Sequence, residues 1–327
     1  MPAPSSDLLP GEPGELAGLA RRIRDLPGVR SKSAIGTVAD VLGGGDWWAG
    51  PGDDGAVVED DGRMLVVGGE AMLPAFVAQD PYGAGIGAMV ANINDLAAMG
   101  ARPLAIVDTL VGPASVCAEI LRGLRWAGER YDVPVVGGHL TETDGAPSFS
   151  AFGLGRANAV LSATHTRPGQ VLIVAACVHG AMRDDFLFFR SFEQQGFQLA
   201  GDVRLLAEIA ESGAAVAAKD VSMAGLIGSL AMLLEPNRLG VTVDLAAVPA
   251  PAGVPVGDWL CCFPSYAFVL TGPADRAGDC VSMFAGHGIT AAVAGELDDS
   301  GAVRLAAGGA AATVFDLRAE GVTRLAR

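Results

Sequence analysis

The chain has 327 residues, half of them hydrophobic, and this length allows two domains that each bury a core. Its formal net charge of −15 at pH 7 argues against a surface for nucleic acid or anionic lipid, because both attract basic side chains. No apolar run reaches about 18 residues without Gly, Pro or a charge, so we expect no membrane-spanning helix.

The five cysteines lie in apolar surroundings and lack the spacing of a metal site. Buried thiols of this kind are typical of a reducing compartment. The N-terminus carries Pro, Ser and acidic residues rather than a charged start followed by an apolar run. We therefore expect a cytoplasmic protein whose partner is a small-molecule substrate, with no nucleic acid and no membrane.

The first half of the chain alternates strands and helices. Residues 1–30 hold one amphipathic helix with Leu16, Leu19 and Ile23 on its apolar face, and the Gly-rich residues 31–55 suit a mobile loop. The following elements predict a β-α-β-α-β-β layer with helices on one face of a mixed sheet: strand 63–68, helix 83–99, strand 104–111, helix 114–130, strand 133–136 and strand 148–155.

A second alternating run follows Pro168-Gly169. It predicts strand 171–176, helix 200–212, strand 214–218, helix 223–234, strands 241–245 and 266–270, helix 274–286 and strand 289–294. The boundary between the halves falls near residues 157–168. The sequence therefore predicts an α+β protein with an N-terminal extension at 1–30, an N-terminal domain at 31–160 and a C-terminal domain at 161–327.

The helix expected at 83–99 carries polar groups on an otherwise apolar surface. Ala88, Asn92 and Asp95 fall at i, i+4 and i+7, so they form one stripe along the helix. Burying an acid is costly unless something pairs with it, and a metal ion would be a natural partner. The alternatives for Asp95 are an N-cap and a helix face in contact with water.

Further acids stand where predicted strands and helices end. They are Asp53 and Asp54 in a Gly-flanked turn, Glu70 after a strand, and Asp220 between a strand and a helix. A solvated turn remains the alternative for the first pair, and an N-cap the alternative for Asp220. If these acids converge, their repulsion requires compensation, which Mg²⁺ and a polyphosphate would supply.

A third kind of segment, Gly137-Gly138-His139-Leu140-Thr141-Glu142, predicts a Gly-rich loop that binds phosphate, because its glycines let the backbone approach a ligand closely. His139 could bond phosphate, act as an acid or base, or be structural. The chain's two lysines, Lys32 and Lys219, each stand beside a segment of interest. For Asp108, inside an apolar strand, we expect only pairing with a neighbouring group.

Taken in chain order, these segments resemble the aminoimidazole ribonucleotide synthetase-like superfamily over roughly residues 30–300. The run Asn-Asp-Leu-Ala-Ala-Met-Gly-Ala at 94–101 is the most specific of them. The others are Gly52-Asp53-Asp54, Gly68-Gly69-Glu70, Gly137-Gly138-His139, Gly153-Leu154-Gly155-Arg156 and Asp220-Val221-Ser222-Met223-Ala224-Gly225-Leu226.

The resemblance implies a two-domain α+β fold, an N-terminal sheet that forms a β-barrel across a homodimer, a C-terminal α/β domain, and bound ATP and Mg²⁺. Matched to thiamine-monophosphate kinase within that superfamily, the chain would place metal at Asp54, Asp95 and Asp220, with Glu70 replacing an Asp and Asp53 beside them. Arg156 and Ser222 match nucleotide-contacting positions of that kinase. Beyond this match, we expect Gly137 and Gly138 to contact nucleotide and His139 to act in catalysis. Lys32 would close over the phosphates by analogy with N-terminal lysines of relatives, and its alternative is a solvated loop lysine.

The chain also departs from that kinase. His139 and Met223 stand where the kinase has acids, and the segment at 262–268 has no acid where the kinase binds its substrate. Thiamine phosphate is therefore not the expected substrate, and this segment resembles an AIR synthase-related group that accompanies nitrilase-type gene clusters. The leading hypothesis is a Mg²⁺-dependent, ATP-using enzyme that phosphorylates or activates a small polar metabolite. The alternative is a catalytically inactive nucleotide-binding subunit that regulates or scaffolds a partner enzyme.

Overall fold

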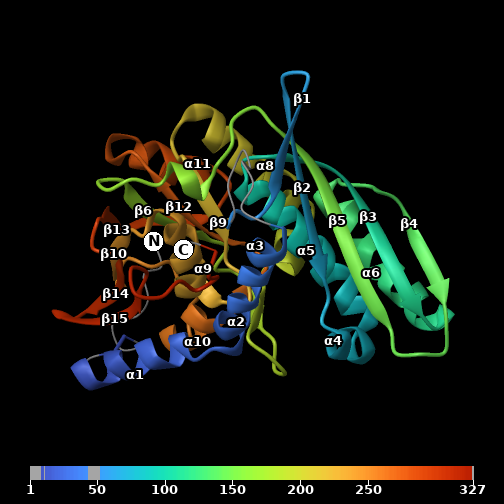
Figure 1. The fold of residues 1–327 in the computed structure, drawn as a ribbon, viewed down its shortest axis with the longest axis horizontal. Helices are drawn as coiled ribbons and strands as arrows, with labels where there is room; N and C mark the ends of the chain where they lie inside the picture. The colour runs from blue at the N-terminus through green and yellow to red at the C-terminus, as the bar shows by residue number, and fades with distance from the viewer. Residues whose placement is uncertain (1–8, 11, 43–51, 326–327) are drawn as a thin grey trace. The chain divides into compact units, whose positions relative to one another are not determined.

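The computed structural model describes residues 9–10, 12–42 and 52–325, and this part of the chain divides into two compact units (Figure 1). The five-stranded unit comprises Asp54–Ala159 and Gln195–Glu208. The seven-stranded unit comprises Met1–Asp53, Val160–Gln194 and Ile209–Arg327. Among the described helices, none combines the length and the apolar character needed to cross a membrane.

The five-stranded unit is built on one mixed sheet with the strand order β1-β2-β5-β3-β4. Strands β3 and β4 run parallel, and the other neighbours run antiparallel. The sheet predicted from the sequence is thus confirmed, with one additional edge strand. The strands are β1 (Ala56–Asp60), β2 (Arg63–Ala71), β3 (Arg102–Gly112), β4 (Val135–Glu142) and β5 (Ser148–Ala157).

Helices cover one face of this sheet, as predicted (Figure 1). They are α5 (Pro81–Ala98) and α6 (Ala114–Tyr131), preceded by the short α4 (Pro74–Gln79). Asp80 is the N-cap of α5, and its carboxylate accepts a hydrogen bond from the backbone N–H of Gly83 at 2.8 Å.

Helices α5 and α6 approach each other through glycines. A Cβ atom on Gly85 would lie 2.2 Å from the carbonyl oxygen of Ile120, and one on Gly123 would lie 2.1 Å from that of Tyr82. Both distances are far below van der Waals contact, so only glycine fits at these two positions. The close packing fixes α5, which carries Asp95, against the rest of its unit.

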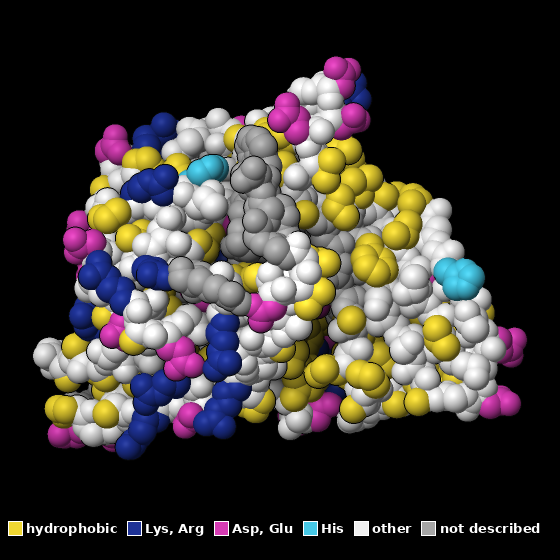
Figure 2. Space-filling view, in the orientation of Figure 1, with side chains coloured by type: hydrophobic (Ala, Val, Ile, Leu, Met, Phe, Trp, Pro, Cys, Tyr) yellow, Lys and Arg dark blue, Asp and Glu magenta, His cyan; other side chains and the backbone are white. Residues whose placement is uncertain are grey.

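The opposite face of the sheet is apolar and exposed. Val107 of β3 pairs with Phe152 of β5, and the two side chains are 40% and 41% exposed. Figure 2 shows hydrophobic side chains gathered over these strands. Strand register places further large apolar side chains on this uncovered face, which consists of Val58, Val67, Val107, Val111, Phe152 and Leu154.

The seven-stranded unit contains a mixed sheet with the order β15-β14-β10-β13-β6-β12-β9 and a small sheet with the order β11-β8-β7. The large sheet consists of β6 (Val171–Ala176), β9 (Ala217–Asp220), β10 (Gly240–Asp244), β12 (Ala267–Gly272), β13 (Thr290–Asp298), β14 (Ala302–Ala307) and β15 (Ala310–Asp316). The small sheet consists of β7 (Ala181–Met182), β8 (Phe188–Arg190) and β11 (Phe263–Pro264).

Helices pack on these sheets, and the apolar face predicted for the first of them is buried at Leu16, Leu19 and Ile23. The helices are α1 (Pro13–Arg24), α2 (Pro27–Arg30), α3 (Gly36–Leu42), α9 (Gly225–Leu234), α10 (Val256–Cys261) and α11 (Ala277–Gly286), together with α7 (Phe192–Gln195) and α8 (Leu199–Ser212), which have residues in both units. Short 3₁₀ turns of this unit are η2 (Ser31–Ile35), η3 (Ala163–His165), η5 (Glu235–Asn237) and η6 (Ala274–Arg276), whereas η4 (Gly196–Gln198) belongs to the five-stranded unit.

Some expectations from the sequence are wrong in detail. The loop predicted from residue 31 is helical up to Leu42, because η2 and α3 occupy this stretch, and the remaining loop positions 43–51 lie outside the described residues. The strand predicted at 214–218 begins only at Ala217. Strands β14 and β15 were not predicted, because their alanine-rich sequence has a weak strand signal.

Candidate functional site

Asp95 lies in the last turn of α5 and is only 8% exposed. The two alternatives for this residue are wrong, since the N-cap of α5 is Asp80 and the Asp95 side chain is buried. A negative charge near a helix C-terminus is disfavoured by the helix dipole, and burial adds to this cost. Asp95 therefore stands where a cation would be stabilising.

The other polar residue of the same stripe has a structural partner. The side-chain amide of Asn92 donates a hydrogen bond at 2.9 Å to the carbonyl oxygen of Ala88, four residues earlier in α5. This amide donor is used within its own helix. The sequence pattern therefore grouped Asn92 with Asp95, although the two side chains have different surroundings.

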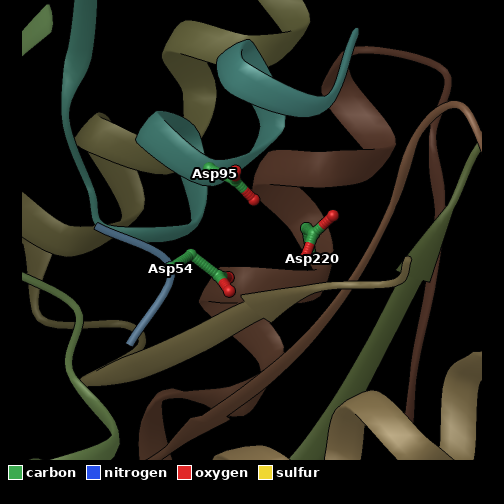
Figure 3. A group of neighbouring side chains, drawn as sticks. All are labelled: Asp54, Asp95 and Asp220. Carbon is green, nitrogen blue, oxygen red and sulfur yellow. The ribbon is translucent and has the colours of Figure 1, made fainter. Parts of the chain in front are cut away.

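Asp54 belongs to the same unit as Asp95 and lies just before β1. An oxygen of each carboxylate lies within 4.8 Å of the other, and Asp220 completes this group of acids (Figure 3). We call Asp54, Asp95 and Asp220 the carboxylate trio. All three were predicted as metal ligands from the sequence, and they are drawn together from positions far apart in the chain.

Asp220 is the last residue of β9 and is 2% exposed. Its N-cap alternative is wrong, because α9 begins after Ala224. The ammonium of Lys219 lies 3.8 Å from a carboxylate oxygen of Asp220, and this lysine is also buried. The sequence assigned Lys219 no role, and its only signal was its position next to Asp220.

The trio has the chemistry of a site for a hard divalent cation. Mg²⁺ prefers carboxylate oxygen at about 2.0–2.1 Å, so two ligands on opposite sides of one ion are about 4.2 Å apart. Oxygens within 4.8 Å of one another can therefore share an ion after small shifts. Two buried side chains and one half-buried side chain would otherwise repel one another.

Two predicted metal ligands lie outside the trio. Asp53 accepts hydrogen bonds from the Ser162 hydroxyl and from the backbone N–H of Ala163, both at 2.7 Å. Glu70 is half-buried in β2, where it pairs with Ala151 of β5. The adjacent acids at 53 and 54 therefore have separate surroundings, which their sequence could not reveal.

The segment predicted to bind phosphate through a glycine loop is a strand. Gly137, Gly138 and His139 are exposed residues of β4, and the His139 ring contacts the Thr141 hydroxyl at 3.3 Å. Gly138 leaves room for Asp108 of β3, because a Cβ there would lie 2.6 Å from the Asp108 carboxylate. Burial raises the pKa of Asp108 above its usual value.

The remaining predicted site residues are spread over other elements. Arg156 is exposed on β5, on the same face of the sheet as Phe152 and Leu154. Ser222 is half-buried between β9 and α9, and its backbone N–H donates to the Ser229 hydroxyl at 3.3 Å. Lys32 is half-buried in η2.

Known protein families match most of the described chain. Residues 52–157 match the AIR synthase related protein, N-terminal domain, and residues 167–308 match the AIR synthase related protein, C-terminal domain. The chain belongs to the AIR synthase-related family. The resemblance inferred from the sequence motifs is therefore confirmed, and so is the two-domain α+β fold that it implied.

Relatives of this AIR synthase-related protein include proteins with and without a stated activity. The uncharacterized protein sll0787 of Synechocystis is 36% identical over 225 residues, which cover 67% of this chain and 69% of that protein. Phosphoribosylformylglycinamidine synthase subunit PurL of Methanosarcina barkeri is 30% identical over 229 residues. That match covers 61% of this chain but only 32% of PurL.

Solved structures show the same fold. T. maritima PurL complexed with ADP has a TM-score of 0.71 at 20% identity, and the match covers 83% of this chain and 46% of that one. AaThiL complexed with AMPPCP and TMP has a TM-score of 0.64 at 18% identity, with 85% and 95% coverage. At such identities the likeness shows the fold alone.

Proposed function

We propose that this protein is a Mg²⁺-dependent, ATP-using enzyme that phosphorylates a small polar metabolite or activates it through a phosphorylated intermediate. The carboxylate trio carries this proposal. Membership of the AIR synthase-related family supports it, since related structures are complexed with ADP, with ATP and with AMPPCP.

In this proposal Asp54, Asp95 and Asp220 hold Mg²⁺, which would neutralise phosphate charge during transfer. The protein's own contribution is positional. Asp95 is fixed by the packing of α5, and Asp220 by its place at the end of a buried strand. Such a site needs no covalent catalyst, because phosphoryl transfer depends mainly on alignment and on charge neutralisation.

The other predicted site residues stay proposals with differing support. Ser222 is the best supported nucleotide contact, because it follows Asp220 by two residues in the same segment. Gly137, Gly138 and Arg156 stay proposed nucleotide contacts, although the glycines lie in a strand. Lys32 and His139 stay the proposed catalytic groups, while Asp53 and Glu70 are further metal ligands in the sequence prediction only.

ADP formation tests the proposal. Wild-type protein should release ADP from ATP with Mg²⁺ when a panel of small polar metabolites is supplied. Removing a residue that only hydrogen-bonds to a metal ligand lowers metal affinity or activity by about 10- to 100-fold. Asp95→Asn changes a proposed ligand itself, so its activity should fall by at least that factor. Glu59→Gln, which changes an exposed acid of β1 in the same unit, is the matched control. ADP release by Asp95→Asn at the wild-type rate would contradict the proposal.

A second candidate function is a nucleotide-binding subunit without activity, which regulates or scaffolds a partner enzyme. Met223, directly after Ser222, is 53% exposed and offers only a thioether, which is a poor ligand for Mg²⁺. This candidate predicts that ATP raises the thermal unfolding midpoint while no ADP forms under any condition. ADP release abolished by Asp95→Asn would exclude it.

We also propose that the protein is a homodimer joined through the uncovered face of the five-stranded sheet. An apolar face of this kind on a protein surface is typical of an interaction site. A second copy would cover it with an identical apolar face, as a two-fold interface requires. The cytoplasmic location and the association with nitrilase gene clusters stay predictions from the sequence.

A further inference from the structure

Lys219 is a buried cation whose place in the fold is fixed by its strand. It lies in β9, an edge strand in which all four residues are buried, and it pairs with Val269 of β12. Its side chain is 7% exposed, and the side chain of its neighbour Asp220 is 3% exposed. A buried ammonium is stable only when negative charge lies nearby.

The separation of the two groups indicates a charge interaction rather than a hydrogen bond. Nitrogen and oxygen are 3.8 Å apart, beyond the usual 2.7–3.2 Å of an N–H···O hydrogen bond. The ammonium of Lys219 therefore acts on Asp220 mainly through its charge. A carboxylate has several acceptor sites, so one with an ammonium at this distance can also bind a metal ion.

The charges near Asp220 favour a single divalent ion. The formal charges of these four side chains, three acids and one lysine, sum to −2. One divalent ion balances these two charges. The segment after Asp220 adds no further acid up to Glu235, and its Met223 offers no hard ligand.

We propose that the ammonium of Lys219 takes the place of a second metal ion, so that the protein binds one divalent cation when nucleotide is absent. This inference rests on the proposed function, because it assumes that the trio binds metal. Lys219 then acts as a positioning residue: it lowers the repulsion within the trio before metal binds, and it weakens the attraction for any additional cation.

Mn²⁺ titration without nucleotide, followed by electron paramagnetic resonance, tests the proposal through binding rather than activity. Wild-type protein should bind one Mn²⁺ per chain. Lys219→Met keeps the length of the side chain but removes its charge, so the first Mn²⁺ should bind about tenfold more tightly or better, and a second Mn²⁺ should become detectable. Lys219→Arg keeps the charge and should match wild type in both respects.

Thermal unfolding supplies a second readout. In metal-free buffer Lys219→Met should unfold at a lower temperature than wild type, because three acids lose their compensating charge. Added Mn²⁺ should then raise its midpoint by more than it raises that of wild type. If Lys219→Met fails to fold, Lys219→Gln replaces it, and the wild-type stoichiometry still decides the question.

The outcomes separate this inference from the proposed function. Two or more Mn²⁺ per wild-type chain, together with ADP formation, would overturn the role of Lys219 alone. Unchanged Mn²⁺ affinity in Lys219→Met with weaker ATP binding would make Lys219 a phosphate ligand instead, which also overturns it. Wild-type protein that neither binds Mn²⁺ nor forms ADP would remove both proposals.

Discussion

Asp53 and Asp54 are neighbours in the chain, yet their carboxylates have different partners among the contacts described above. Asp53 accepts two hydrogen bonds from the start of η3, whereas Asp54 belongs to the carboxylate trio. The first acid therefore anchors the backbone that leads into the second. The sequence could indicate that this pair of acids contains a functional residue. It could not show which of the two, because side-chain directions in a turn follow no repeating pattern.

Asparagine at the two positions should have different effects. In Asp53→Asn one carboxylate oxygen is replaced by an amide donor that faces the Ser162 hydroxyl or the Ala163 N–H. The free energy of unfolding should therefore fall by about 1–3 kcal/mol. Asp54→Asn should mainly weaken Mn²⁺ binding. Urea denaturation and Mn²⁺ titration of both variants measure this contrast, and equal losses of stability would contradict it.

Asp108 is an acid that the fold buries in a sheet without using it in the trio. Its pKa is raised by burial, so the folded state binds this proton more tightly than the unfolded state does. The charged form therefore destabilises the fold. This cost is absent below the ordinary pKa of an aspartate, and it grows as the pH rises towards the folded-state pKa.

Asp108→Asn removes the charge that destabilises the fold. The variant should unfold at a higher temperature than wild type near pH 8, and the difference should shrink as the pH is lowered towards 4. Thermal unfolding of both proteins across this pH range measures the effect. A variant that is less stable than wild type at pH 8 would show that the charged carboxylate stabilises the fold.

At the scale of the element, α5 holds Asp95 in place because its backbone lies almost against that of α6. The contact depends on Gly85 and Gly123, where any side chain would meet a carbonyl group of the other helix. This close contact limits where α5 can lie against α6. The position of the helix that carries Asp95 therefore depends on glycines that lie outside the site.

Gly123→Ala should separate the two helices, since its new methyl group would lie 2.1 Å from the Tyr82 oxygen. Overpacking of this kind costs about 1–3 kcal/mol of unfolding free energy. Gly18→Ala in α1 is the matched control, because a Cβ there meets nothing within 4 Å and alanine favours a helix by about 0.5–1 kcal/mol. In urea denaturation, the unfolding midpoint should fall for Gly123→Ala and rise for Gly18→Ala.

Elements with clear periodicity were predicted from the sequence, and elements with mixed signals were not. Helix α6 shows its buried face directly in the sequence. Strand β3 was predicted from its apolar run, although Asp108 lies on its buried face and Val107 on its exposed face. Strands β14 and β15 are rich in alanine. They pair with each other, and β14 also pairs with β10, which is distant in the sequence. Pairing with other strands, rather than the local strand propensity, makes these two segments strands.

The residues of the candidate site likewise include some that the sequence predicted correctly and some that it did not. Acids that end a strand or a helix, such as Asp95 and Asp220, were predicted to be ligands and belong to the trio. The glycines at 137 and 138 were expected in a loop, yet they extend β4, since β3 offers them a parallel partner. A glycine pair is compatible with both structures, so only the fold could separate them.

At the scale of the whole molecule, the uncovered face of the five-stranded sheet predicts self-association. Val107→Asp places a charge beside Phe152 on this face, and desolvating that charge in an apolar interface is costly. The variant should sediment as a monomer where wild type sediments as a dimer. Leu121→Asp, at a 39% exposed position on α6, should leave the dimer intact. Monomeric wild-type protein would contradict the proposed interface.

The two ends of the described chain meet in the seven-stranded unit. Helix α1 contacts β15, and the Arg24 side chain donates a hydrogen bond at 3.4 Å to the carbonyl oxygen of Val314. Arg24 and Val314 are 290 residues apart, so on the ribosome the helix emerges long before the strand that it contacts. Until that stretch of chain has been made, the apolar face of α1 has no β15 to pack against.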